Sequence, residues 1–213
     1  MAQIRAIFWD VGGVLLTNGW DTTERHAVLN QFGLDAGDIE QFEHLHPGPN
    51  DQWEKGEITV NEYLSRTLFT EPRSFTSDEF VAAMKAQSRV LADGAMPVLH
   101  AIAKAGIYKV VMLNNEAAEL NDFRIEKFGF RDQFVAFCSS CYVGLRKPDP
   151  KIFQRATQIM QVEPEESVFI DDREGNIKIA VGLGMQGVQF TTPDALVKEL
   201  KSLGVDNLNL SGM

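Results

Sequence analysis

The sequence predicts an α/β fold: a Rossmann-like parallel sheet with helices on both faces, plus a small all-helical cap domain. Three observations predict it. Several short runs are apolar almost throughout, which is typical of strands that are covered on both faces. Helical stretches alternate with the later runs, and strand-helix-strand alternation indicates parallel strands. One long interval after the first run contains helix starts and few strand signals.

Five runs rich in β-branched and aromatic residues are the expected strands. They cover residues 5–9, 109–113, 134–137, 167–170 and 187–190. Helices are expected over 96–106, 148–160 and 176–184. The second of these helices has Asp149 as its N-cap and Pro150 at its first helical position, where no N–H is needed. The first ends at Gly106, a residue suited to stop a helix.

The interval 17–92 breaks this rhythm and is the expected cap. Asp21, Thr59 and Thr76 each stand three residues before a glutamate, the pattern of a capping box at a helix start. The Pro-Gly-Pro sequence after His46 is expected to form a loop. The predicted domains are an α/β core of residues 1–16 and 93–213 and a helical cap of residues 17–92.

Composition and charge limit the classes of protein to which the chain can belong. The chain has 213 residues, of which 44% are hydrophobic, and a formal net charge of −10. The length suits one core domain with a small insertion, and the acidic balance argues against a nucleic-acid or anionic-membrane surface. No apolar run approaches the roughly 18 residues of a membrane span, and no signal-peptide pattern begins the chain. We expect a cytoplasmic monomer or homodimer that binds neither nucleic acid nor membrane.

Three short motifs receive structural interpretations. Cys138 and Cys141 form a C-x-x-C pair, but no second pair completes a zinc site, so two buried cysteines near a strand end are expected. The sequence G-L-G-M-Q-G at 182–187 matches a dinucleotide-binding pattern, yet it follows a helix, which predicts a helix C-cap and a turn. The tripeptide at 209–211 is a glycosylation sequence only in form, because secretion is not expected.

Polar side chains follow the ends of four expected strands. They are Asp10 after the first strand, Asn114, Asn115 and Glu116 after the second, Lys147 after the third, and Asp171 and Asp172 after the fourth. Ligands of open α/β sheets bind beyond the carboxyl ends of the strands, so we expect these groups to meet. Adjacent carboxylates suit a bound Mg²⁺, a lysine neutralises a phosphate, and an aspartate can act as a nucleophile.

These segments resemble the four motifs of the haloacid dehalogenase-like hydrolase superfamily. The motifs are D-V-G-G-V-L, V-M-L-N-N, G-L-R-K-P-D-P-K-I-F and V-F-I-D-D-R-E-G-N-I. The resemblance covers almost the whole chain outside the insertion, which itself resembles the helical cap of that family. It is strongest to the branch of small-molecule phosphatases that includes sugar-phosphate phosphatases. It implies a Mg²⁺-dependent phosphatase that hydrolyses a small phosphorylated metabolite, such as a sugar phosphate, through an aspartyl-phosphate on Asp10.

The resemblance also implies a metal site. Asp10 would be both the nucleophile and a Mg²⁺ ligand, and Gly12 would offer its backbone carbonyl to the metal. Asp172 would be the direct acidic ligand, while Asp171 would either bind Mg²⁺ directly or stand just behind the ligands.

The remaining site residues follow from the other motifs. Asn114 takes the place of the Ser or Thr of the second motif and would hydrogen-bond the phosphoryl oxygens, with Asn115 beside it. Lys147 would stabilise Asp10 and the transferring phosphoryl group. Asn176 would open the helix that follows the fourth motif.

Gly12 departs from the family pattern. The phosphatases usually carry a second Asp there, which protonates the leaving alcohol and later activates water, help that is worth roughly 10²- to 10⁴-fold. Either another group or water substitutes, or the enzyme is slow, or the protein is not a phosphomonoesterase. The alternatives are a 2-haloacid dehalogenase, for which the Asp171-Asp172 pair has no use, a phosphomutase, and a catalytically weak regulatory protein that binds metal and phosphate.

The cap is expected to choose the substrate, because the core reads only phosphate and metal. Trp20 lies just after the nucleophile loop and is the residue expected to line the cleft. His44 and His46 could bind hydroxyl groups. Trp53 is expected to pack inside the cap.

Overall fold

The computed structural model describes residues 2–206 and contains a five-stranded sheet with the order β3-β2-β1-β4-β5. All neighbouring strands are parallel. The strands are β1 (Ala6–Trp9), β2 (Lys109–Met112), β3 (Ala136–Phe137), β4 (Ser167–Asp171) and β5 (Gln186–Gln189). The expected strands are confirmed, with ends shifted by at most two residues. The glycosylation-like sequence at 209–211 lies outside the described residues.

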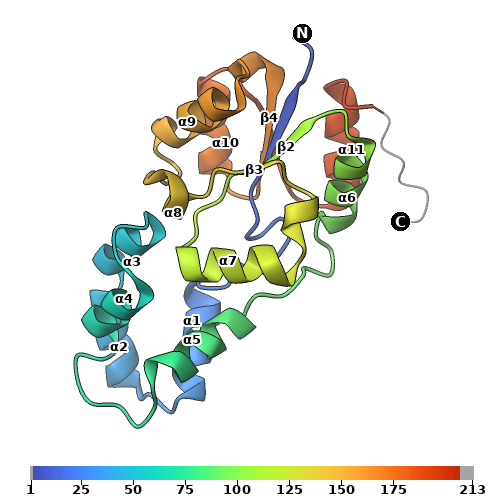
Figure 1. The fold of residues 1–213 in the computed structure, drawn as a ribbon. Helices are drawn as coiled ribbons and strands as arrows, with labels where there is room; N and C mark the ends of the chain where they lie inside the picture. Colours follow the sequence, from blue (N-terminus) through green and yellow to red (C-terminus); the bar gives the residue numbers. More distant parts are fainter. Residues whose placement is uncertain (1, 207–213) are drawn as a thin grey trace.

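Helices cover both faces of this sheet. They are α6 (Met96–Ala105), α7 (Ala118–Lys127), α8 (Ser140–Val143), α9 (Pro150–Met160), α10 (Glu174–Gly182) and α11 (Pro193–Ser202), with short 3₁₀ turns at Phe130–Asp132 and Pro164–Glu166. Figure 1 shows α6 and α11 on one side and α9 and α10 on the other. Ile7 and Trp9 pack with the first pair, whereas Phe8 packs with the second. Both faces are therefore buried, which explains the apolar strands.

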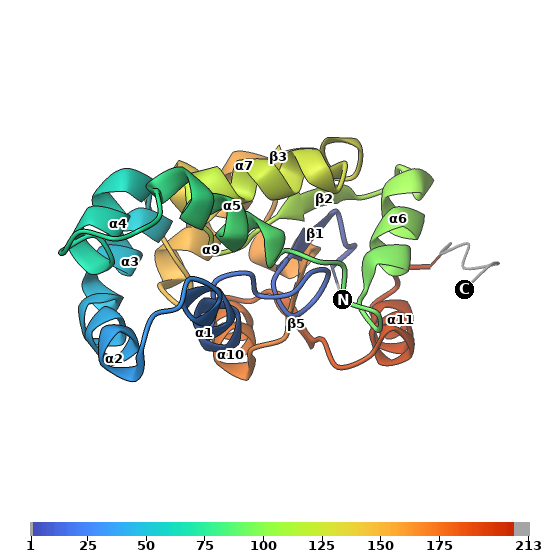
Figure 2. The same cartoon turned by 90° about the horizontal axis from the view of Figure 1, so that it is seen from below.

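The interval between β1 and α6 is helical, as expected. It contains α1 (Thr22–Gln31), α2 (Ala36–Leu45), α3 (Pro47–Glu54), α4 (Val60–Thr67) and α5 (Ser77–Ala86), which we call the helical insertion. Its apolar cluster includes Trp53 and Tyr63, whose rings stack at 4.5 Å. Ala117 and Leu120 of the α/β part join this cluster, so the insertion packs firmly at one end of the sheet (Figures 1 and 2).

Capping bonds explain where the insertion helices begin. Thr59 and Thr76 form reciprocal capping boxes with the glutamates three residues later, as expected. Asp21 caps α1 by accepting from the N–H of Thr22, and the reciprocal bond is not formed. Asp35 begins α2 with a capping box that the sequence analysis did not single out.

The prediction of a loop after His46 is wrong. Pro47 begins α3, and His46 joins α2 directly to α3. The first helical position tolerates proline because its N–H has no partner within the helix. The Pro-Gly-Pro sequence therefore starts a helix, and His46 is buried at the junction of two helices.

The other glycine interpretations are confirmed, and the prediction of two buried cysteines is confirmed for Cys138 only. Gly106 ends α6 with φ 66°, and Gly184 with φ 98° turns the chain from α10 into β5. Cys138 is buried, Cys141 is half-buried, and both are free thiols. Burial raises the pKa of Cys138 to about 11 and that of Cys141 to about 12, so both stay protonated and unreactive at neutral pH. Within residues 2–206, no helix has the length and apolarity needed to cross a membrane.

Candidate active site

The carboxyl ends of β1 and β4 bring three aspartates together. Asp10 follows β1, Asp171 ends β4, and Asp172 comes next. β1 and β4 are paired neighbours at the point where the chain switches from one half of the sheet to the other, which is where open α/β sheets bind ligands. One carboxylate oxygen from each aspartate lies within 4.8 Å of the others. The three predicted residues therefore form one acidic cluster that could hold a metal ion.

Lys147 lies inside this cluster. Its Nζ is 3.0 Å from Oδ1 of Asp10 and 2.6 Å from Oδ2 of Asp171. Burial opposes the charge of this lysine, but the attraction of the two carboxylates outweighs it and raises the pKa of Lys147. Asn115 fixes the main chain of Lys147, because its carboxamide accepts from the N–H and donates to the carbonyl, both at 2.8 Å.

Asp171 is fully buried, and its oxygens are satisfied by the chain. Besides Lys147, it accepts from the side chain of Asn176 at 2.9 Å and from the N–H of Arg173 at 2.8 Å. The prediction that Asn176 opens the next helix is corrected: α10 begins at Glu174, and Asn176, in its first turn, points back to Asp171. This network orients Asp171 behind the cluster.

Asp172 is less well satisfied. Its Oδ1 is buried and has no hydrogen-bond partner among residues 2–206. Burial, and then the charge of Asp171, raise the pKa of Asp172; burial also raises the pKa of Asp10, to about 7. A buried, unpartnered carboxylate oxygen beside two more carboxylates is unfavourable unless a cation binds. This set of oxygen donors fits a hard divalent cation.

The turn after β1 is shaped to the cluster. The N–H of Val11 donates to Oδ1 of Asp10 at 2.8 Å, which orients the carboxylate. Gly13 has φ 72°, a conformation that favours glycine, and any side chain there would collide with Asp172. Gly12 lines the same cavity as Asp10.

Asn114 lies elsewhere than predicted. It is 1% exposed and does not belong to the described wall of the cavity beside Asp10. Its Nδ2 donates to Asn121 at 3.0 Å and its Oδ1 accepts from Ser139 at 2.7 Å. The predicted catalytic and substrate-binding role of its side chain is therefore corrected, because both ends of the carboxamide already tie the end of β2 to neighbouring segments.

A cavity of about 210 Å³ opens beside Asp10, between the helical insertion and the α/β part. Gly12, Trp20, Asn115 and Lys147, all predicted site residues, line it. All other residues of its described wall are polar or charged. The volume is smaller than the roughly 300–1,000 Å³ of pockets for drug-sized ligands, so the cavity suits a compact polar molecule.

Each lysine and arginine side chain in the described wall of this cavity is paired with a carboxylate of the chain. Besides Lys147, the pairs are Arg25 with Glu43 at 2.8 Å, Arg124 with Glu116 at 2.5 Å, Arg146 with Glu54 at 2.8 Å and Asp51 at 3.1 Å, and Arg173 with Asp21 at 3.0 Å. The cavity therefore offers little surplus positive charge to a ligand with several anionic groups.

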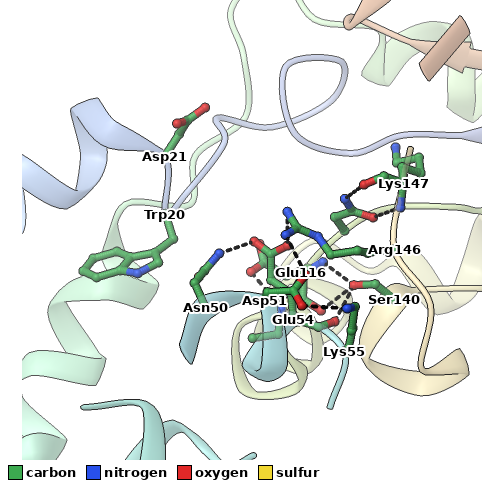
Figure 3. A network of polar contacts seen from close by, with 12 residues as sticks. Trp20, Asp21, Asn50, Asp51, Glu54, Lys55, Glu116, Ser140, Arg146 and Lys147 are labelled. Carbon is green, nitrogen blue, oxygen red and sulfur yellow. Dashed lines mark hydrogen bonds and ion pairs between the residues drawn. The ribbon is translucent and has the colours of Figure 1, made fainter. Parts of the chain in front are cut away.

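Helix α3 contacts the residue that precedes Lys147, as Figure 3 shows. Asp51 and Glu54 of α3 both pair with Arg146, and Ser140 donates to the carbonyl of Glu54 at 2.6 Å. Burial raises the pKa of Glu54, although Arg146 lowers it. Arg146 and Glu54 are not among the residues predicted from the sequence. The available signal was the position of Arg146 next to Lys147.

A second buried ion pair, between Arg124 and Glu116, lies in the cavity wall. Arg124 also contacts the two segments that connect the helical insertion to the α/β part. Arg124 of α7 pairs with Glu116 and also donates to Oγ of Ser88 and to the carbonyl of Asn18, each at 3.0 Å. Asn18 precedes α1 and Ser88 follows α5. Burial raises the pKa of Glu116 to about 7, although Arg124 lowers it. Arg124 is not among the residues predicted from the sequence, because nothing in its local sequence distinguishes it from a surface arginine.

Trp20, Tyr63 and His46 form a hydrogen-bonded chain at the insertion side of the cavity. Trp20 Nε1 lies 2.9 Å, and His46 Nδ1 2.8 Å, from the hydroxyl of Tyr63. Indole N–H only donates, so the Tyr63 oxygen accepts from Trp20. Among residues 2–206, His46 Nδ1 is the only acceptor within hydrogen-bond distance of this buried hydroxyl, so Tyr63 donates its proton there. The hydrogen of His46 is then on Nε2. Trp20 also packs edge-on against Phe80 at 5.9 Å, and both Trp20 and His46 line the cavity.

The fold and the clustered strand-end residues define an α/β protein with a candidate metal centre at the carboxyl ends of its strands. The family model of the haloacid dehalogenase-like hydrolases matches residues 4–184. The chain belongs to this family, and the resemblance found in its motifs is confirmed.

Relatives of known name support a hydrolase. The chain is 32% identical to flavin mononucleotide hydrolase 1 of Arabidopsis thaliana over 91% of its own length and 78% of the relative. It is 25% identical to the sesquiterpene phosphatase astK of Aspergillus oryzae, over 93% and 96% of the two chains. It is also 28% identical to mouse acyl-CoA dehydrogenase family member 10, but it spans only 19% of that protein.

Solved structures agree with the fold. A HAD family enzyme of Bacteroides thetaiotaomicron, crystallised with magnesium and inorganic phosphate, matches with a TM-score of 0.73 and 26% identity, over 89% of this chain and 95% of that one. The L-2-haloacid dehalogenase of Xanthobacter autotrophicus matches with a TM-score of 0.62 and 19% identity, over 94% and 83%. The second likeness shows the fold alone.

Proposed function

We propose that this hydrolase is a Mg²⁺-dependent phosphatase that acts on a small phosphorylated metabolite through an aspartyl-phosphate on Asp10. One observation carries the proposal: Asp10 is paired with Lys147 and clustered with the unsatisfied Asp172, and Asp10 and Lys147 line a small polar cavity. Asp10, Asp172 and the carbonyl of Gly12 would hold Mg²⁺, with Asp171 behind them. When bound, Mg²⁺ would neutralise charge on the phosphoryl group and favour the ionised form of Asp10.

The residues of the chain divide the work as follows. Lys147 neutralises the phosphoryl oxygens while Asp10 attacks phosphorus, because its ammonium is already held beside the carboxylate. Asp171 and Asn115 keep that ammonium in place. The bond between phosphorus and the leaving oxygen breaks as the bond to Asp10 forms, and that oxygen takes a proton from water. In the second step the oxygen of a water molecule bonds to phosphorus, its proton passes to solvent, and the bond to Asp10 breaks, which releases inorganic phosphate and the Asp10 carboxylate.

The proposed substrate has one phosphate and an uncharged polar remainder, such as a sugar phosphate. Each cation in the described cavity wall already has a carboxylate partner, which disfavours a second phosphate. The small polar cavity also disfavours an apolar sesquiterpene or a broad flavin ring. We further propose that residues 17–92 act as a cap that contributes Trp20 and His46 to substrate recognition, and that the enzyme works in the cytosol as a monomer or homodimer, away from nucleic acid and membranes.

A substrate panel tests this proposal. Phosphate release would be measured on hexose monophosphates, a hexose bisphosphate, flavin mononucleotide and 4-nitrophenyl phosphate, with Mg²⁺ and with a chelator. We expect Mg²⁺-dependent release that favours monophosphates. Release of halide from 2-haloacids without Mg²⁺ would instead indicate a dehalogenase, and Mg²⁺ binding without turnover would indicate a regulatory protein.

A further inference from the structure

The space beside Gly12 is occupied by another residue. A Cβ built on Gly12 would lie 2.6 Å from Oδ1 of Asn18 and 3.6 Å from its Cγ. Unlike Gly13, Gly12 does not have a positive φ, so its backbone does not demand glycine. The carboxamide of Asn18 occupies the place into which a side chain at position 12 would extend.

The main chain of Asn18 is fixed in this position. Its carbonyl accepts from Arg124 at 3.0 Å and from the N–H of Trp20 at 2.9 Å. Gly19 then turns the chain with φ 73°, and a side chain there would collide with the guanidinium of Arg124. Arg124 is itself buried and paired with Glu116. The loop is therefore built to present Asn18 above Gly12.

The carboxamide of Asn18 is free to bind a ligand. Asn18 lines the cavity that contains Asp10, and its side chain has no hydrogen bond to the rest of residues 2–206, since only its carbonyl is bonded. A carboxamide offers both a donor and an acceptor. Asn18 can thus contact an oxygen on phosphorus in either half of a phosphoryl-transfer reaction.

We propose that Asn18 is a catalytic residue that takes the place of the side chain absent at position 12, a role that rests on the proposed phosphatase function. As a bond forms between Asp10 and phosphorus and the bond to the leaving oxygen breaks, the amide N–H binds that oxygen, which takes its proton from water. In the second step, the amide oxygen orients a water molecule. Its oxygen bonds to phosphorus, the bond to Asp10 breaks, and the proton passes to solvent water.

This substitution has a chemical consequence. A carboxamide orients but does not transfer protons, so the enzyme lacks general acid help, which is typically worth about 10²- to 10⁴-fold. Esters whose leaving group needs no protonation, such as 4-nitrophenyl phosphate, are then cleaved faster than alkyl phosphates. Replacement of Asn18 by its isosteric acid places a carboxyl group where the reaction can use one.

The test compares Asn18→Asp and Asn18→Ala with wild type on 4-nitrophenyl phosphate and on glycerol 2-phosphate, an alkyl ester. We expect Asn18→Ala to lower kcat on both esters by about 10-fold. Asn18→Asp should raise the alkyl-to-aryl ratio of kcat by at least about 10-fold and add a new ionisation to the pH profile of kcat. Asn30→Asp, which adds the same charge at an exposed position of α1, should change neither quantity.

A double-mutant cycle tests the steric relationship. Gly12→Ala should lower activity in the wild-type background by pushing Asn18 aside, and the fold-loss should be smaller when Asn18 is already Gly. One outcome would overturn the role of Asn18 and leave the proposed function standing. In it, wild type cleaves 4-nitrophenyl phosphate, but Asn18→Asp changes neither the alkyl-to-aryl ratio of kcat nor its pH profile, and the double-mutant cycle shows no coupling between positions 12 and 18. If wild type cleaves no phosphate ester, the proposed function fails and this role fails with it.

Discussion

Lys147 lies closer to Asp171 than to Asp10, with Nζ 2.6 Å from the first and 3.0 Å from the second. The aspartate at the end of β4 therefore holds the lysine, and the aspartate after β1 shares it. This arrangement separates two tasks. Asp171 is satisfied by the chain and positions the ammonium, which leaves Asp10 and Asp172 available to react and to bind a cation.

Asp171→Asn should destabilise the fold. The change removes the partner that holds a buried ammonium, and breaking a buried ion pair typically costs about 3–5 kcal/mol; the remaining pair with Asp10 brings the expected loss to about 3 kcal/mol. Denaturant unfolding measures it. Asp149→Asn, which keeps an N-cap side chain at the exposed start of α9, is the control and should change stability by less than about 1 kcal/mol.

Asp172→Asn should weaken Mg²⁺ binding while the protein stays folded. The variant removes one carboxylate from the cluster and leaves the ion pairs of Lys147 intact. Calorimetric titration with Mg²⁺ should show affinity reduced by at least about 10-fold relative to wild type. Asp194→Asn, an exposed change in α11, should leave the titration unchanged. Equal affinity in both variants would remove Asp172 from the metal site.

His46 should remain neutral far below the usual pKa of histidine. Burial, and then the charge of Arg25, lower its pKa to about 4. In the unfolded chain His46 binds a proton near pH 6.5, whereas in the folded protein it does so only near pH 4. The contribution of His46 to the free energy of unfolding is therefore fully present above pH 6.5 and is lost as the pH falls towards 4. Nitrogen-15 NMR should show an unprotonated Nδ1 at pH 6. A protonated Nδ1 would contradict the chain from Trp20 through Tyr63.

Arg124→Met should destabilise the protein more than the same substitution of an exposed arginine. The change leaves Glu116 buried without its partner and removes the bonds to Asn18 and Ser88, with an expected cost of about 3–5 kcal/mol. Arg131→Met disrupts an exposed pair with Glu126 and should cost less than about 1 kcal/mol. Thermal unfolding measures the loss of stability in each variant. Equal losses would show that Arg124 does not stabilise the contact between the helical insertion and the α/β part.

The sequence predicts the sheet well because its signals are local. Apolar runs such as 167–170 need burial on both faces, and Asp10, Lys147 and Asp171 follow from the rule that strand ends converge. Asn114 shows the limit of that reasoning. It stands at a strand end like the others, but its direction depends on Asn121 and Ser139, which come from later segments.

Residues of the cavity wall were harder to predict for the same reason. Arg124 and Glu54 act through partners far away in the sequence, and their local patterns are those of ordinary surface helices. The absence of a side chain at Gly12 was visible, whereas the presence of Asn18 in its place depends on how the loop folds back. His46 was misplaced because Pro-Gly-Pro starts a helix there.

Phosphate release by wild type and by Asp10→Asn, measured with Mg²⁺ on 4-nitrophenyl phosphate and on the best monophosphate of the panel, tests the central claim most directly. Asparagine keeps the shape of Asp10 but cannot attack phosphorus, so a folded variant should lose at least about 10³-fold in kcat. An Asp10→Asn protein that is folded, binds Mg²⁺ and retains the turnover of wild type would contradict the account.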